Sequence, residues 1–378
     1  MSGTSVDGVD AALVELRRSP EKLRVRLLAF VSSPYPHAVR EQILRLAGGQ
    51  PVSVGELSQL NFLLGELFAA AALQVCRRGG VALKRLSVIG SHGQTIYHQG
   101  APTHAAGQRI SSTLQIAEPS VIAERTRLPV VADFRTADIA AGGQGAPLVP
   151  MVDYLLLRDD REGRVVLNMG GIANITVIPA HAKPEDIFGF DTGPGNMVID
   201  MLVRHFTRGR KTYDAGGQRA ASGKPIEPLL AQLLRLPFFR RQPPKSAGRE
   251  QFGSEFVQQY FLSRRDACFE DLLRTATELT AHSIAGAIKR FALPRAKVQR
   301  LIVSGGGAHN RLLVSRLAEL LPDLSVDLSD KYGLPVDAKE AIAFAVLADR
   351  TLHGLPGNLP SVTGARRAVV LGKLVRPG

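Results

Sequence analysis

The sequence predicts a protein of the α/β class that is built from two domains. Stretches rich in β-branched residues alternate along the chain with stretches of helical periodicity, which is typical of this class. A chain of 378 residues is too long for one ordinary core and too short for three. With 45% hydrophobic and 21% charged residues, the composition is that of a globular protein.

Charge, cysteines and hydropathy narrow the classes of function. The net charge is +13, but lysines and arginines are scattered, so we expect a basic surface that attracts anionic small substrates and no nucleic-acid partner. Cys76 and Cys268 are far apart, which argues against a disulfide scaffold and favours a reducing compartment, the cytoplasm. No apolar run approaches the roughly 20 residues that span a bilayer, so we also expect no membrane partner.

The first elements are a hairpin and a long helix. Residues 9–16 and 23–31 are strand-like stretches joined by a charged connection, as in a β-hairpin. Ser53 and Glu56 form a capping box before a long apolar periodicity, and two arginines followed by Gly79 predict where that helix ends.

Two short strands follow, and both end in polar residues. We expect these strands over residues 86–90 and 128–132. Because ligands of open α/β sheets collect at strand ends, both ends are candidate sites. The polar residues that follow the two strands are His92, Gln94, Asp133 and Arg135. The Gly/Pro-rich stretch 141–150 then predicts a crossing between domains.

Three strands of the second half end in glycines. They are expected over residues 165–169, 187–190 and 301–304, and helices are expected over 197–206 and 311–321. The glycines that follow these strands are Gly170, Gly171, Gly193, Gly195, Gly305, Gly306 and Gly307. Each loop taken alone is equally consistent with a turn or a flexible connection. Several separate glycine loops that grasp one nucleotide are the alternative.

The run D-T-G-P-G-N, residues 191–196, is the most informative of the three. It places one carboxylate, Asp191, beside a loop of phosphate size, and the helix that follows directs its free N–H groups toward the same place. Asp191 taken alone is also consistent with a turn aspartate at the end of a strand.

Two other carboxylates are open to more than one interpretation. Asp7 lies among the glycines and hydroxyl residues of the first eight positions, where Asp7-Gly8 is also a common turn signal. Glu340 lies three residues after Asp337 at the start of a helix predicted over 338–352. This spacing matches a capping box, and the alternative is that Glu340 binds metal or water.

Several common catalytic designs are missing from the sequence. No G-x-x-x-x-G-K-[ST] loop and no helix-opening G-x-G-x-x-G occurs, which excludes the two commonest nucleotide-binding designs. No histidines stand at H-E-x-x-H spacing and no G-x-S-x-G elbow is present, so a zinc hydrolase and a serine hydrolase have no support.

Taken together, the motifs resemble one family, the anhydro-N-acetylmuramic acid kinases of the sugar kinase, actin and heat-shock chaperone superfamily. The resemblance runs nearly end to end. The motifs, in order, are M-S-G-T-S-V-D-G-V-D, G-S-H-G-Q-T, V-A-D-F-R, G-G-Q-G-A-P-L-V-P, N-M-G-G-I-A-N, F-D-T-G-P-G-N, P-P-K-S-A-G-R-E, S-G-G-G-A-H-N and K-E-A.

The resemblance implies a two-domain, actin-like (ribonuclease H-like) fold that binds MgATP and a bicyclic sugar in the cleft between its domains. The first domain would comprise residues 1–131 plus 351–378, and the second residues 132–350. By similarity, ATP would be bound by Ser2, Gly3, Thr4, Ser5, Asp7, Gly8 and by the glycines of the three loops. The sugar side would be lined by His92, Gln94, Asp133, Arg135, Gly143 and Gln144. A homodimer is also implied.

The resemblance further implies the reaction. Water would open the 1,6-anhydro ring of 1,6-anhydro-N-acetylmuramic acid while the freed O6 takes a phosphoryl group from ATP, giving N-acetylmuramic acid 6-phosphate and ADP in cell-wall recycling. The family's base maps onto Asp191, and Asp7 and Glu340 are the candidates for Mg²⁺. We expect Arg135 to bind the lactyl carboxylate of the sugar as a fork; its alternative is an ion pair with Asp133 or Asp138.

Two departures from the family pattern carry expectations. Family members have a strand immediately before M-S-G-T-S, and this chain starts at Met1. We expect weak or undetectable kinase activity without that strand, because its ladder partners would be unpaired, and recovery when about ten upstream residues are restored. Ala247 stands where the family usually has threonine.

Two other functions compete with this interpretation. A related kinase for a plain anhydrohexose such as levoglucosan would share Asp191 and the glycine loops. An ATP-driven chaperone, filament former or sugar-sensing regulator is the alternative of another class. It normally carries an extra domain for which no region is left here.

Overall fold

The computed structural model describes residues 1–3, 6–19 and 22–378, and it confirms the α/β class. The chain divides into two compact units, unit 1 with Met1–Leu156 and Ala338–Gly378 and unit 2 with Leu157–Asp337. These limits differ from the predicted domain boundaries at 131/132 and 350/351. The helix α14 (Lys339–Leu352) explains part of the difference, because it packs on strands of unit 1.

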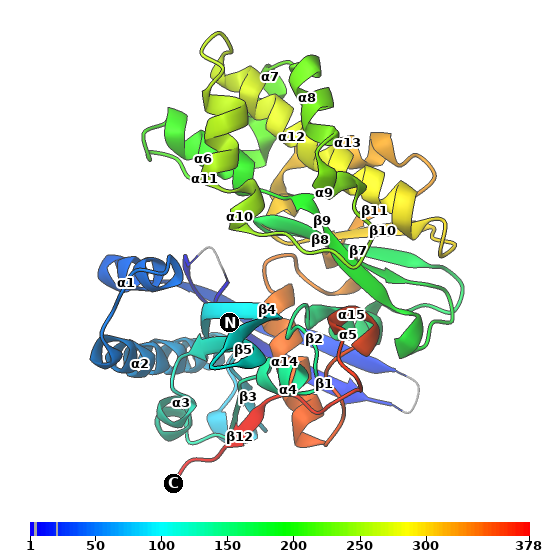
Figure 1. Ribbon diagram of the computed structural model, residues 1–378. Helices are drawn as coiled ribbons and strands as arrows, with labels where there is room; N and C mark the ends of the chain where they lie inside the picture. Colours follow the sequence, from blue (N-terminus) through cyan, green and yellow to red (C-terminus); the bar gives the residue numbers. More distant parts are fainter. Residues whose placement is uncertain (4–5, 20–21) are drawn as a thin grey trace. The chain divides into compact units, whose positions relative to one another are not determined.

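Unit 1 contains three separate small sheets (Figure 1). Their strands are β1 (Gly8–Arg18) with β2 (Leu23–Pro34), β12 (Lys373–Val375) with β6 (Val130–Ala132) and β3 (Ile89–Gly90), and β4 (Gln94–Ala105) with β5 (Gln108–Ile116). The helices of unit 1 are α1 (His37–Ala47), α2 (Val54–Arg78), η1 (Leu83–Arg85), α3 (Pro119–Thr126), α4 (Thr136–Ala140), α5 (Val149–Leu157), which ends at the unit boundary, α14 and α15 (Pro360–Thr363).

The predicted hairpin is confirmed. β1 and β2 pair antiparallel over their whole lengths, with one irregularity in register after Leu13. Alternate residues of β1 face the core of unit 1, where Val9 and Leu13 are buried. The hairpin thus covers one side of that core, as the alternating pattern requires.

The helix α2 forms as the sequence predicts. The Ser53 hydroxyl accepts a hydrogen bond from the Glu56 amide, the Glu56 carboxylate accepts one from the Ser53 amide, and the helix ends at Gly79. One expectation needs correction, because α2 is long and apolar enough by length and composition to cross a membrane. Its apolar residues Leu60, Leu64 and Phe68 are buried in the core of unit 1, which accounts for that composition.

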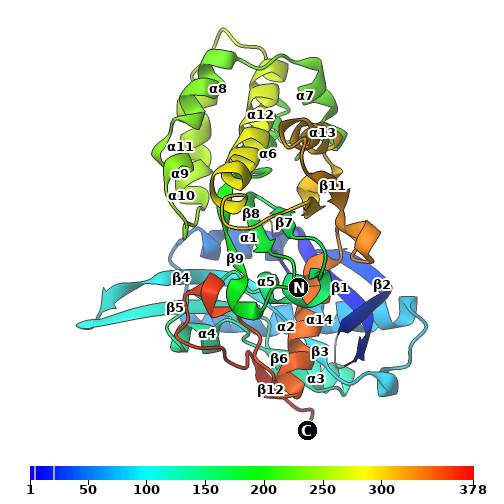
Figure 2. The same ribbon diagram turned by 90° about the vertical axis from the view of Figure 1, so that its right-hand side faces the viewer.

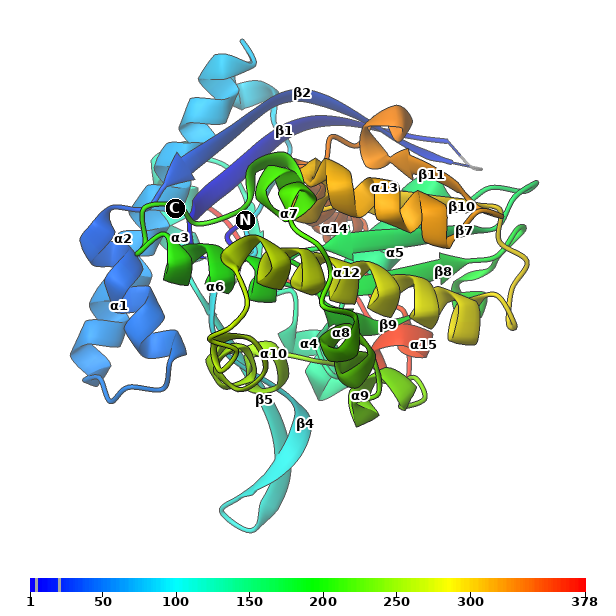
Figure 3. The same ribbon diagram turned by 90° about the horizontal axis from the view of Figure 1, so that it is seen from above.

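The hairpin of β4 and β5 was not predicted. In Figures 2 and 3 it extends away from the other elements of unit 1, and its distal residues are exposed. A cavity of about 120 Å³ lies elsewhere in unit 1, among β1, β3, α2 and α14.

Unit 2 is built on one five-stranded sheet with the order β11-β10-β7-β8-β9. The strands are β7 (Arg164–Met169), β8 (Ile172–Ile178), β9 (Phe188–Pro194), β10 (Arg300–Ser304) and β11 (Ser325–Leu328). The helices are η2 (Pro184–Asp186), α6 (Met197–Phe206), η3 (Ala215–Gly217), α7 (Gln218–Ser222), α8 (Glu227–Leu234), α9 (Pro237–Arg240), α10 (Arg249–Phe252), α11 (Ser254–Val257), η4 (Gln258–Leu262), α12 (Phe269–Ala287), η5 (Ile288–Ala292), η6 (Gly306–His309), α13 (Arg311–Leu320) and η7 (Ser329–Tyr332).

The long helix α12 joins the two cores of unit 2. Its residues Ala281, Ile284 and Ala285 belong to the core over the sheet, and Leu272 and Leu279 belong to a second core made by helices. Thirteen of its residues are buried, including three threonines and one serine, so α12 packs against its neighbours on most of its surface. The sheet therefore has a rigid support beneath β9.

The structure corrects two local predictions about the site. The D-T-G-P segment is not a loop: β9 continues through Pro194 and pairs with β8, and α6 begins at Met197 as expected. The capping box at α14 is wrong, because the N-cap is Ala338 and no side chain caps the helix. Asp337 Oδ1 instead lies within hydrogen-bond distance of His309 Nε2, at 2.7 Å.

Candidate functional site

Asp191 lies on β9 and is held by the segment 245–247. Its amide donates to the carbonyl oxygen of Lys245 at 3.1 Å, and its Oδ2 accepts from the amide of Ala247 at 2.8 Å. No hydrogen bond from the described residues reaches Oδ1. Burial raises the pKa of Asp191 to about 6, against the opposing effects of the Ala247 amide and the Lys245 charge. The carboxylate is therefore fixed through one oxygen and free to take a proton with the other.

The three predicted glycine loops meet in unit 2. The amides of Gly195 and Asn196 donate to the carbonyl oxygens of Gly171 and Gly170 at 2.9 and 2.8 Å. A Cβ on Gly195 would lie 2.3 Å from the Gly170 oxygen, and one on Gly305 would lie 2.5 Å from Asn168 Oδ1. Gly305 also has φ +80°, a conformation that favours glycine. The strand ends thus approach one another so closely that side chains do not fit.

Helix α12 supports the same place from below. Thr280 Oγ1 donates to the carbonyl oxygen of Gly195 at 2.9 Å, and a Cβ on Gly193 would lie 3.0 Å from Ser283 Oγ. Both residues are buried. The predicted ATP-binding glycines Gly193 and Gly195 are therefore packed against a helix that cannot easily move.

In unit 1 the residues predicted for ATP phosphates are tied to a residue predicted for the sugar. Ser2 Oγ lies 2.6 Å from Gln94 Oε1, and Gln94 Nε2 donates to the Gly3 carbonyl at 3.4 Å. Gln94 is buried, so its amide is used to hold the segment that begins at Ser2. Thr4 and Ser5 lie outside the described residues. Gly8 begins β1, where a Cβ would lie 2.2 Å from the Ser33 oxygen.

The two carboxylates predicted for Mg²⁺ have different surroundings. Asp7 is exposed and lies 3.6 Å from Arg40. Glu340 is half-buried on the first turn of α14, and its charge acts on the Arg135 guanidinium. Among the residues that the structure describes, no three His, Cys, Asp or Glu side chains form a group that could hold a metal. Mg²⁺ usually binds one or two carboxylates together with phosphates and water, so the single carboxylate of Asp7 is a suitable protein ligand for that ion.

His92 and Arg135 form a second group in unit 1. Arg135 donates from Nε and Nη2 to Nε2 of His92 at 3.0 and 2.9 Å, and from Nη1 to the Gly145 oxygen at 2.7 Å. His92 Nδ1 contacts the Gly93 oxygen at 2.9 Å, and the ring packs on Phe344. Burial, followed by the Arg135 charge, holds the pKa of His92 well below its usual value. His92 is therefore neutral and carries its proton on Nδ1.

The alternative ion pairs of Arg135 are not found. Asp133 pairs with Lys373 at 2.7 Å, and Asp138 accepts from Asn358, Thr363 and the Gly145 amide. Burial lowers the pKa of Arg135 to about 10, against the opposing charges of Glu340 and Asp138. The guanidinium is thus held by a neutral ring and a carbonyl.

The segment 141–150 belongs to unit 1 and is not the crossing between units. Gly143 is buried, and a Cβ there would lie 2.2 Å from Asp138 Oδ2. Gln144 is exposed, and its amide donates to the Thr363 oxygen at 2.8 Å. These bonds tie the segment to the C-terminal part of the chain, whereas the first crossing falls between Leu156 and Leu157.

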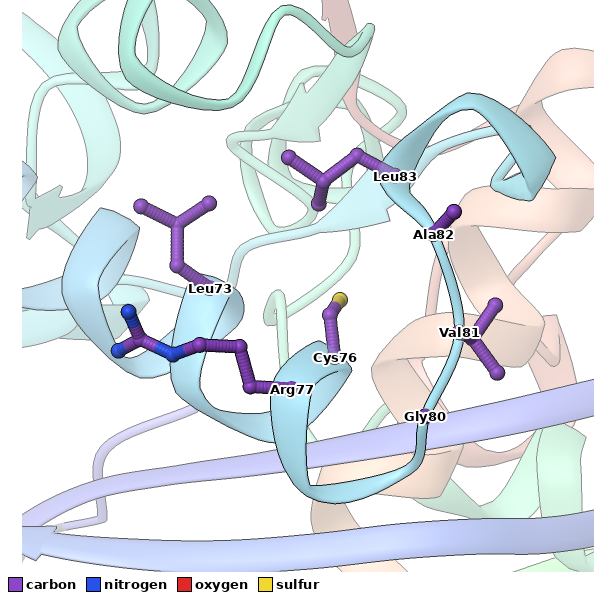
Figure 4. Close-up of a pocket in the computed structure, with 7 residues that line it drawn as sticks. All are labelled: Leu73, Cys76, Arg77, Gly80, Val81, Ala82 and Leu83. Carbon is purple, nitrogen blue, oxygen red and sulfur yellow. The ribbon is translucent and has the colours of Figure 1, made fainter.

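A second hollow of unit 1 lies away from the predicted site residues. Figure 4 shows this depression of about 450 Å³ at the end of α2. It is lined by Leu73, Cys76, Arg77, Gly80, Val81, Ala82 and Leu83. None of the residues predicted for the site lies there, and its lining offers no pair of groups for acid-base chemistry.

Lys245 is a buried residue of the site for which the sequence predicts no individual role. Its side chain is buried, and Nζ donates to the Phe238 oxygen at 3.1 Å. Burial lowers its pKa to about 8, helped by the charges of Arg290 and Arg241. The only signal in the sequence was its place inside the motif P-P-K-S-A-G-R-E. Nothing local predicts that this lysine turns inward beside Asp191.

The comparisons with known proteins give the family. Residues 1–377 match the family described as anhydro-N-acetylmuramic acid kinase. The chain belongs to this family. A member from Caldanaerobacter subterraneus subsp. tengcongensis is 45% identical over 378 residues, with 99% of this chain and 95% of the relative covered. One from Bacillus cereus strain Q1 is 43% identical over 379 residues, with 100% of this chain and 98% of the relative covered. The predicted resemblance is confirmed.

Solved structures are more distant. Component A of the (R)-2-hydroxyglutaryl-CoA dehydratase of Acidaminococcus fermentans has a TM-score of 0.37 and 8% identity, with 90% of this chain and 99% of that chain covered. The activator of the 2-hydroxyisocaproyl-CoA dehydratase of Clostridium difficile, with bound ADPNP, has a TM-score of 0.32 and 13% identity, with 59% of this chain and 70% of that chain covered. Scores this low carry no argument about the present chain.

Proposed function

We propose that this chain is an ATP-dependent kinase that opens the anhydro ring of 1,6-anhydro-N-acetylmuramic acid and phosphorylates its O6. Family membership over residues 1–377 supports this activity. The observation that carries the chemistry is the carboxylate of Asp191, which is fixed through Oδ2 and has no bonding partner for Oδ1 among the described side chains and amides. Such a group is suited to remove a proton from water.

The pKa of Asp191 suits a general base. A base works best when its pKa lies near the operating pH, because it is then mostly deprotonated and still basic enough to take a proton. Burial brings this carboxylate from its ordinary value of 3.8 to about 6. At neutral pH Asp191 is mostly ionised and is a stronger base than an exposed aspartate.

The reaction balances with one protein carboxylate. The oxygen of water forms a bond to C1 of the sugar, and Asp191 takes one proton from that water. The bond between C1 and the bridging oxygen breaks, and that oxygen, now O6, forms a bond to the γ-phosphorus of ATP as ADP leaves. The phosphoryl group replaces the second carboxylic acid that an inverting glycosidase uses to protonate its leaving oxygen. The proton on Asp191 passes to solvent.

We assign the nucleotide to the glycine loops of unit 2. At Gly170, Gly171 and Gly306 a Cβ would meet no atom beyond its chain neighbours closer than 3.3 Å, so this backbone is open to phosphate or ribose oxygens. Gly193, Gly195, Gly305 and Gly307 let the segments around it pack closely on one another. In unit 1, the segment from Ser2 to Gly8 is assigned to phosphates, and Asp7 would bind Mg²⁺ through its exposed carboxylate. When bound, Mg²⁺ neutralises part of the phosphate charge.

We assign recognition of the sugar to the group around Arg135. His92 is neutral and fixes two of the guanidinium nitrogens, which orients the fork. A lactyl carboxylate is a suitable partner for such a guanidinium, because the Arg135 cation is half-buried and its hydrogen-bond partners, the His92 ring and the Gly145 oxygen, are neutral. A plain anhydrohexose offers no carboxylate to this arginine.

The experiment uses heavy-oxygen water. The chain is incubated with MgATP and 1,6-anhydro-N-acetylmuramic acid, and the product is analysed by mass spectrometry. We expect a 6-phosphorylated sugar that carries the label at C1. A phosphorylated product with its anhydro ring intact would refute the mechanism, and faster turnover of levoglucosan would refute the assigned substrate. Sedimentation of the same sample tests the homodimer.

A further inference from the structure

Lys245 occupies an unusual environment for a lysine. It is 5% exposed, and its Nζ lies 4.7 Å from the ring centre of Phe238, 5.1 Å from that of Phe291 and 5.9 Å from that of Phe190. The ammonium donates one hydrogen bond, to the Phe238 oxygen. A buried ammonium is costly unless nearby groups stabilise it, and aromatic faces are among the groups that do so.

The aromatic box is connected to Asp191 through the chain. Phe190 is the residue immediately before Asp191 on β9, and its ring packs edge-on against Phe291 at 5.8 Å. Lys245 inserts among these rings from the neighbouring segment. The side chain of Lys245 thus fastens its own backbone to the strand that carries the carboxylate.

The backbone of the same segment holds Asp191 directly. The Lys245 carbonyl accepts from the Asp191 amide, and two residues later the Ala247 amide donates to Asp191 Oδ2. We propose that Lys245 is a positioning residue, whose ammonium anchors the segment 243–247 in the aromatic box and thereby keeps the Asp191 carboxylate in place for proton transfer. Only the proton transfer rests on the proposed function. The anchoring itself is a property of the folded chain.

The charges around the pair set the direction of the electrostatic effect. The elements that pack here contribute Arg241 after α9, Arg290 from η5 and Glu250 from α10. The Lys245 charge lowers the pKa of Asp191, and Glu250 raises it. Removal of the ammonium should therefore raise the pKa of Asp191, in addition to loosening its segment.

The test compares three variants of the full chain. Lys245→Met keeps the length of the side chain without the charge, and Lys245→Arg keeps the charge. Lys297→Met removes an exposed lysine of unit 2 and serves as the control. The carboxyl carbon of Asp191 is followed by NMR in aspartate-labelled protein, with Asp191→Asn for assignment. Hydrogen exchange of the Ala247 amide and the pH profile of the kinase reaction are measured on the same samples.

For Lys245→Met we expect a rise of about one unit in the pKa of Asp191 and faster exchange of the Ala247 amide. We also expect a loss of about tenfold in kcat with the KM for ATP unchanged. Lys245→Arg should retain the pKa of Asp191, and Lys297→Met should match the parent. A folded Lys245→Met chain with unchanged titration of Asp191 and unchanged exchange at Ala247 would overturn the proposal.

Measurements on the parent chain decide two further cases, a variant that does not fold and a parent without kinase activity. If Lys245→Met does not fold, the Ala247 amide signal of the parent decides. It should move in two steps with pH, one from Asp191 and one from Lys245, and a missing second step contradicts the anchoring. If neither the parent nor a form with about ten upstream residues restored shows kinase activity, the proposed function fails. The NMR and exchange measurements still decide whether Lys245 holds Asp191.

Discussion

The two units hold their candidate groups in place by different means. In unit 2 the glycine loops and Asp191 lie at the ends of strands in one continuous sheet, and backbone hydrogen bonds join them. In unit 1 the candidate residues come from short strands and loops, and side chains such as Gln94 and Arg135 join them. A substitution that adds atoms where backbones pack closely disturbs the whole arrangement in unit 2. A substitution in the side-chain network of unit 1 removes only the contacts of that one residue.

This difference predicts how substitutions act. A change in unit 2 should remove the chemistry or the loop geometry at once. A change in unit 1 should alter affinity for one ligand and leave the rest intact. The following substitutions test that contrast, beginning with the largest effect.

Asp191→Asn should lower kcat by about a thousandfold, because an amide cannot take a proton from water and a general base typically contributes two to four powers of ten. Steady-state kinetics with the anhydro sugar measures this. Asp323→Asn, at an exposed aspartate of the same unit, should retain full activity. A loss of less than tenfold for Asp191→Asn would exclude it as the base.

The same variant should be more stable than its parent at neutral pH. The folded pKa of Asp191 is about 6 and its ordinary value is 3.8. The folded state therefore keeps the proton that the unfolded state releases, and ionisation lowers stability as pH rises through this window. Asp191→Asn removes that cost, about 1–3 kcal/mol above pH ~6, and the advantage should vanish below pH ~4. Urea unfolding at the two pH values tests the sign.

Gly195→Ala should disrupt the meeting of the glycine loops. Its Cβ would lie 2.3 Å from the backbone oxygen of Gly170, which lies in the turn between β7 and β8 and accepts a hydrogen bond from the Asn196 amide. We expect a loss of about 2–3 kcal/mol in stability and at least a tenfold rise in the KM for ATP. Gly286→Ala on α12 is the matched control, since a Cβ there meets nothing within 4 Å. That change should stabilise the helix by about 0.5–1 kcal/mol.

The sequence predicted what depends on neighbours in the chain. The limits of α6, the capping box at Ser53 and the glycines after β7 and β10 follow from local patterns, and the structure confirms them. Local patterns could not predict that Lys245 turns into an aromatic box, because two of the three rings, Phe190 and Phe291, lie far from it in the sequence. Likewise the apparent box at Asp337 fails, because His309 pairs with that carboxylate.

Arg135→Lys should raise the KM for the sugar by about tenfold and leave kcat nearly unchanged. Lysine cannot reproduce the three donors that contact His92 and Gly145, so the fork loses its orientation. Arg109→Lys on the exposed β4–β5 hairpin is the control. An unchanged KM for the sugar in Arg135→Lys would remove this residue from substrate recognition.

The smallest changes in stability and activity are expected at the starts of two helices, α2 and α6. Ser53→Ala at α2 should cost about 1 kcal/mol of stability and leave activity intact, because the capping box serves only the helix. Asn196→Ala at α6 removes no capping bond, since that helix start has none. Its side-chain oxygen lies 3.2 Å from where a Cβ on Gly307 would stand, so this change should weaken ATP binding with little loss of stability. If both variants lose stability equally and ATP affinity is retained, the start of α6 is an ordinary helix start, and the assignment of the glycine loops to the nucleotide loses one of its supports.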